Sequence, residues 1–70
     1  MTAPSAVTER AERFSVFLRR LCETQAYALA GDPTARQVLG EYSLARWCGV
    51  SPERALAQAE SMVAYAGRGT

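Results

Sequence analysis

The stretch CGVSP, residues 48–52, decides the fold of this 70-residue chain, because it combines the signals that end one helix and begin the next. Gly49 suits the position after a helix, where the backbone turns left-handed. Ser51 is a favoured N-cap residue, and Pro52 suits the first helical turn, where its missing N–H would have no partner. The stretch therefore predicts a helix that ends near residue 48 and another that begins at Pro52.

The same succession of an opening proline and a closing glycine divides the rest of the chain. The pairs are Pro4 with Gly31, Pro33 with Gly49 and Pro52 with Gly67. They predict helices at about 5–30, 33–48 and 52–66, joined by very short links, and short links favour antiparallel neighbours. We expect a single all-α domain over residues 1–70, a three-helix protein with a long N-terminal helix packed against a short helix-turn-helix-like hairpin.

A mostly apolar stripe of the first helix follows alternating spacings of four and three, which is typical of a helix packed lengthwise on a neighbour. Phe17 and Cys22 widen this stripe, whose members are Val7, Ala11, Phe14, Leu18, Leu21, Gln25 and Ala28. Each later helix is about half as long. We therefore expect part of the stripe to be uncovered in one subunit, and a homodimer formed along Val7, Phe14, Leu18 and Leu21 is one interpretation.

The two shorter helices carry their own inner stripes. We expect Ala35, Val38, Leu39, Tyr42 and Ala45 to face inward from the second helix, and Ala55, Leu56, Ala59, Met62, Val63 and Ala66 from the third. Gly40 interrupts the second segment and leaves two interpretations. It permits a close helix crossing within one helix, or it splits the segment, with Ser43 capping the second part. We favour one helix.

Composition excludes several kinds of chemistry. The net charge is +1, and the chain has no Lys and no His. Catalysis that needs a His base, a His metal ligand or a Schiff-base lysine is therefore excluded. The acidic residues are scattered along polar faces, and we expect no enzymatic activity, no cofactor and no metal site. Two distant cysteines make no disulfide framework, so we expect free, buried thiols.

Segments that target or anchor a protein are not evident in the sequence. The first residues are polar and uncharged rather than basic and then apolar, unlike a signal peptide. The longest apolar runs, residues 26–30 and 62–66, are far below the roughly 20 residues that span a bilayer. We expect a soluble cytoplasmic protein that makes no membrane contact.

The segment LARWCGVSPERAL, residues 44–56, resembles the turn of the helix-turn-helix in lactose-repressor-type regulators. In that family a small Ala precedes the turn Gly by four residues, and Val-Ser-Pro often follows, which matches Ala45 and residues 49–52. The chain departs from the pattern at Glu41 and Gln58, where the family has apolar residues. An ordinary helical corner needs the same turn residues. The resemblance implies an alternative function, a DNA-binding transcriptional regulator that uses residues 44–66, with Arg46, Arg54 and Gln58 as the candidate DNA-binding residues.

Large amphipathic side chains are numerous for so small a core. Trp47 lies on the side of its helix opposite Val38 and Tyr42, so it either seals a core edge or forms an exposed anchor, and Trp is enriched at binding hot spots. The leading hypothesis is a non-enzymatic protein–protein interaction module: an accessory, adaptor, docking or inhibitor protein that binds a protein partner, a second copy of itself, or both. The candidate partner-binding residues are Phe14, Phe17, Leu18, Leu21, Trp47 and Tyr65.

Overall fold

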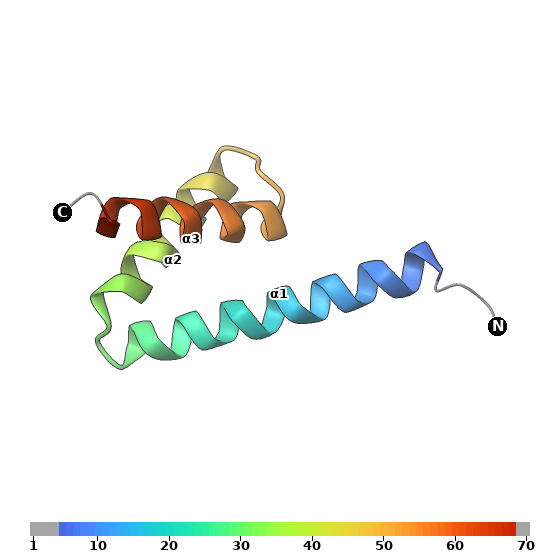
Figure 1. Ribbon diagram of the computed structural model, residues 1–70, viewed down its shortest axis with the longest axis horizontal. Coiled ribbons are helices and arrows are strands. Elements are labelled where there is room, and N and C mark those ends of the chain that lie inside the picture. The colour runs from blue at the N-terminus through green and yellow to red at the C-terminus, as the bar shows by residue number, and fades with distance from the viewer. Residues whose placement is uncertain (1–4, 69–70) are drawn as a thin grey trace.

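Three helices make up the computed structural model, which describes residues 5–68. They are α1 (Ala6–Leu29), α2 (Pro33–Trp47) and α3 (Pro52–Arg68). In Figure 1 the long α1 lies beneath a hairpin formed by α2 and α3, and its N-terminal part extends away from that hairpin. The expected all-α, three-helix architecture is confirmed.

The turn between α1 and α2 is closed by backbone hydrogen bonds that only a left-handed residue allows. Gly31 has a φ of 99°. Its N–H donates to Ala28 O at 3.1 Å, and the N–H of Asp32 donates to Tyr27 O at 3.0 Å. These two bonds form a Schellman motif, which satisfies carbonyls at the end of α1. The Asp32 carboxylate then accepts from the Thr34 N–H at 3.0 Å, so one short link ends α1 and caps α2.

The turn between α2 and α3 repeats this arrangement. Gly49 has a φ of 92°, and its N–H donates to Arg46 O at 3.0 Å. The N–H of Val50 donates to Ala45 O at 3.0 Å, which completes a second Schellman motif. The half-buried Val50 and Ala45 thus belong to the turn that CGVSP predicts.

The outer ends of the fold differ in how well the sequence predicts them. The Ser5 hydroxyl accepts from the Thr8 N–H at 3.2 Å and caps α1, while Pro4, the predicted opener, lies outside the described residues. At the other end the prediction is wrong. Gly67 does not close α3, which continues to Arg68. Gly67 lacks the positive φ that Gly31 and Gly49 adopt, and a glycine without it can remain helical.

The core lies where all three helices meet. It is centred on Phe17 from α1, Val38 from α2, and Leu56 and Ala59 from α3. Leu21, Tyr42 and Val63 pack against it while remaining partly exposed. The start of α2 lies beside the end of α3, as expected for antiparallel neighbours. Most of the expected inner residues therefore face inward, but Met62 and Ala66, both in the second half of α3, are exposed.

Two polar contacts fasten α1 to the hairpin. The Arg36 side chain donates from Nε to Ala28 O at 3.1 Å, next to the first turn. Farther along α1, Arg20 pairs with Glu60 of α3. Both contacts lie in the C-terminal half of α1, and within residues 5–68 no such polar contact joins the stretch from Ala6 to Val16 to the hairpin.

Gly40 offers a test of these local conformations. It lies within a continuous α2, and an added Cβ would meet no heavy atom within 4 Å, so no close helix crossing requires it. Gly40→Ala is expected to raise the free energy of unfolding by about 0.5–1 kcal/mol, because glycine is a poor helix former. Gly49→Ala should instead lower it by about 1–2 kcal/mol, since it forces alanine into a left-handed conformation. Urea denaturation of both variants measures these opposite changes in the free energy of unfolding. A Gly40→Ala variant less stable than the wild type would contradict this account.

Candidate functional site

The charged residues of α1 occupy only about half of its circumference. They are Glu9, Arg10, Glu12, Arg13, Arg19, Arg20 and Glu23. The other half carries no charge. One edge of that half, at Leu21 and Ala28, packs toward the hairpin. We define the uncharged face of α1 by six exposed residues of this half, among which the polar Gln25 also lies: Val7, Ala11, Phe14, Leu18, Cys22 and Leu29.

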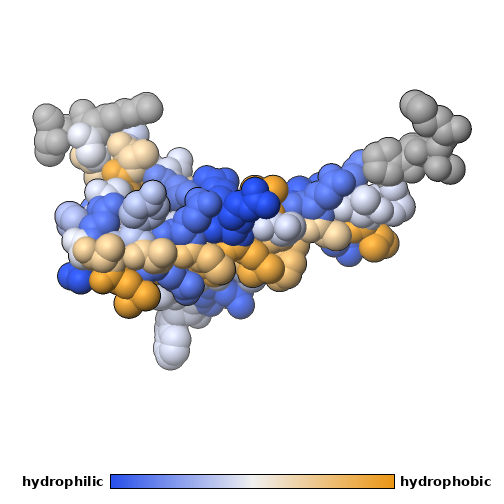
Figure 2. Space-filling model, turned by 90° about the horizontal axis from the view of Figure 1, so that it is seen from below, coloured by the Kyte–Doolittle hydropathy of each residue, from blue (hydrophilic) through white to orange (hydrophobic). Residues whose placement is uncertain are grey.

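This face is most open in the first half of the helix. Every residue from Ser5 to Val16 is exposed, and the relative exposure of Val7 is 75% and that of Phe14 is 48%. Figure 2 views the molecule from below and shows a row of apolar side chains along one edge of α1, beside charged side chains. A helical segment of this length is marginal in water by itself. The first half of α1 therefore depends on the rest of the helix and on its Ser5 cap to remain helical. Its exposed apolar side chains are available for a contact with another protein.

The structure separates the predicted partner-binding residues of α1. Phe14 and Leu18 are exposed, Leu18 at 42%, and Leu21 is half-buried against the core. Phe17 is 7% exposed and belongs to the core, so it is not part of the uncharged face of α1. Its ring packs toward Tyr42 at a centroid distance of 6.4 Å, because the hairpin covers the side of α1 on which Phe17 lies.

The two predicted aromatic anchors are both exposed, Trp47 at 88% and Tyr65 at 81%. The interpretation that Trp47 seals a core edge is therefore wrong. The two lie at opposite ends of the antiparallel hairpin and form no common patch. Each has an exposed apolar neighbour three residues earlier, Leu44 or Met62. Leu44 is missed by sequence reasoning, which expects Met62 to face inward. The helical spacing of three residues was the signal for both pairs.

Both cysteines are free but exposed, so the expectation that they are buried is wrong. Cys22 lies on the uncharged face of α1, and Cys48 follows the last residue of α2 in the second turn. Neither position is covered by another helix.

The candidate DNA-binding residues surround the second turn. Arg46 donates from Nη1 to Val50 O at 2.8 Å, so its guanidinium is engaged in closing the turn. Arg54 and Gln58 line a shallow hollow beside residues 48–51. Arg13 and Arg20 of α1 do not extend this basic surface, because they line a different hollow together with glutamates of α3.

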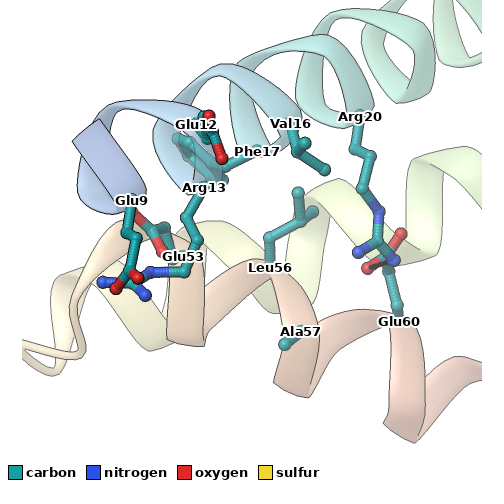
Figure 3. A pocket seen from close by; sticks show the side chains of 10 residues that line it. All are labelled: Glu9, Glu12, Arg13, Val16, Phe17, Arg20, Glu53, Leu56, Ala57 and Glu60. Carbon is teal, nitrogen blue, oxygen red and sulfur yellow. Dashed lines mark hydrogen bonds and ion pairs between the residues drawn. The ribbon is translucent and has the colours of Figure 1, made fainter. Parts of the chain in front are cut away.

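That hollow, the α1/α3 groove, has a volume of about 530 Å³. Figure 3 shows Val16 and Leu56 pointing toward one another from the two helices, with the Arg20–Glu60 pair at one end. Four charged side chains lie at the other end: Glu9, Glu12, Arg13 and Glu53. The groove therefore combines an apolar middle with a charged, mainly acidic end.

Residues 5–68 contain neither a candidate metal site nor a candidate membrane-spanning helix. In that part of the chain no three His, Cys, Asp or Glu side chains are grouped to hold a metal ion. None of the three helices, as far as the structure describes them, has the length and apolar character needed to cross a membrane. Comparisons of the chain with protein-family models, with curated proteins and with solved structures give no match.

Proposed function

We propose that this protein is a small non-enzymatic interaction module that binds a helix of a partner protein along the uncharged face of α1, with a second copy of the chain as the partner to test first. The observation that carries the proposal is the exposure of this face along the stretch from Ser5 to Val16, in which no residue is buried. Apolar patches on small proteins commonly mark interaction sites.

The energetics favour a helical partner. Val7, Phe14 and Leu18 follow one another at spacings of seven and four residues, so their side chains lie in one line along α1. Burial of one such side chain contributes about 1.5–3 kcal/mol relative to exposure. Ala11 and Cys22 beside this line are small and uncharged, which allows a second helix to approach closely without burying a charge.

Leu18→Glu tests the proposal at the middle of the face. We expect the variant to remain folded, since Leu18 lies outside the core, and to weaken self-association or partner binding at least tenfold. Size-exclusion chromatography with light scattering over a concentration series measures self-association. A pull-down from the native host measures binding to other proteins.

Tyr27→Glu is the matched control, because Tyr27 is exposed on the opposite side of the same helix. It should leave both measurements unchanged. The proposal fails if the wild-type protein is monomeric at high micromolar concentration and also retains no partner. It fails equally if Leu18→Glu and Tyr27→Glu behave alike.

A further inference from the structure

We propose that the α1/α3 groove is a second binding site, which accepts an amphipathic segment of another protein that presents an arginine or lysine next to an apolar side chain. This site lies mainly on the charged side of α1 and borders the uncharged face at Glu53, which also lines a hollow with Val7 and Phe14. Its charges and apolar middle are separate from that face, so the site does not depend on the function proposed above. The occupant follows from the order of charge and apolar surface along the groove.

The middle of the groove provides the apolar contact. Val16 and Ala57 are exposed on its two walls, and Phe17 and Leu56 lie beneath them in the core. A volume of about 530 Å³ is within the range of about 300–1,000 Å³ that is usual for ligand sites. Since Phe17 and Leu56 are fixed by core packing, the floor of the groove exists before a partner arrives, and little ordering is required on binding.

The charges at the acidic end are unbalanced. Arg20 and Glu60 pair with one another and close the opposite end. Three carboxylates, those of Glu9, Glu12 and Glu53, line the acidic end together with the guanidinium of Arg13. Arg10 lines the adjoining hollow beside Glu53, so three carboxylates face two guanidiniums there. In residues 5–68 none of the four side chains that line the acidic end forms an ion pair within 4.0 Å. An incoming cation would therefore meet an excess of negative charge there.

The sign of this charge selects the class of partner. The whole protein carries a net charge of +1, so it has no general attraction for basic segments, and any preference must come from the groove. Phosphate groups of nucleic acids or lipids would be repelled by the same carboxylates. Complementary charges at an interface mainly provide specificity and faster association, while the apolar contact provides affinity.

A short fluorescein-labelled peptide with leucines at helical spacing and arginines between them is a suitable probe. Fluorescence anisotropy should show at least tenfold tighter binding of this peptide than of a peptide in which every arginine is replaced by glutamate. Added salt should weaken the binding, since the charges at the rim are exposed. Equal binding of the two peptides would overturn the proposal, as would no binding of either.

Substitutions locate the site. The triple variant Glu9→Gln, Glu12→Gln and Glu53→Gln should weaken binding of the arginine peptide about tenfold. Glu23→Gln, on α1 but outside the groove, should not change it. Ala57→Arg, which fills the groove from α3 with a competing cation, should weaken binding as well, and circular dichroism confirms that each variant is folded. If both groove variants bind as the wild type does, the assignment is wrong.

Leu18→Glu should bind the peptide normally, which separates this site from the uncharged face of α1.

Discussion

Leu56→Ala is expected to lower the free energy of unfolding by about 2–5 kcal/mol, the largest loss of any single substitution in α3. Leu56 is 2% exposed and is the largest side chain that is fully buried within residues 5–68. It packs where α1, α2 and α3 meet, in the cluster that contains Phe17, Val38 and Ala59. Truncation would remove apolar contacts where the three helices meet and leave a cavity in the core that joins them.

A loss of this size is large for so small a protein. Domains of this length bury a modest share of their surface, so the total stability is expected near the lower end of the usual range of about 5–15 kcal/mol. Leu56→Ala should therefore retain no more than about 3 kcal/mol of stability, and at the upper end of the expected loss it is partly unfolded at 25 °C without denaturant. Circular dichroism during urea denaturation measures this. Leu56→Met keeps the volume and should cost less than about 1.5 kcal/mol. If Leu56→Ala cost no more than Leu56→Met, this core would not be what joins the three helices.

Local chemistry made the helix boundaries predictable. At both turns a glycine, the polar or apolar residue after it and a nearby proline act within a few residues of sequence, and the structure has the corresponding Schellman bonds at Gly31 and Gly49. Gly67 shows the limit of this reasoning. A glycine predicts a helix end only if the chain turns left-handed at that point, and nothing local at the end of α3 requires this.

The covered side of α1 could not be predicted from its stripe alone. With the residues that widen it, the stripe is so broad that the sequence gives no reason to expect Phe14 and Phe17 to differ in burial. In the structure Phe14 is 48% exposed and Phe17 is buried. The difference arises from the direction in which the α2–α3 hairpin leaves the turn at Gly31, which is a property of tertiary packing. The α1/α3 groove was missed for the same reason, since it unites residues such as Arg20 and Glu60, which are 40 positions apart.

Phe17→Ala should therefore lower the free energy of unfolding by about 3–5 kcal/mol, whereas Phe14→Ala should lower it by no more than about 1 kcal/mol. Phe17 is enclosed by the core and contributes ring contacts to Phe14 and Tyr42, with centroids 5.8 and 6.4 Å away. Phe14 keeps 48% of its surface in solvent, so the folded monomer loses little when its ring is removed. Urea denaturation at a concentration low enough to keep the protein monomeric compares the two variants.

The same pair of variants separates folding from binding. Phe14→Ala should fold normally and still self-associate or bind its partner more weakly, because its ring lies on the uncharged face of α1. Phe17→Ala should lose binding only to the extent that it loses folded protein, which a urea titration followed by circular dichroism quantifies. Equal losses of stability in the two variants would show that Phe14 is a core residue. The first half of α1 would then be held by the protein itself, and its apolar surface would need no partner to account for it.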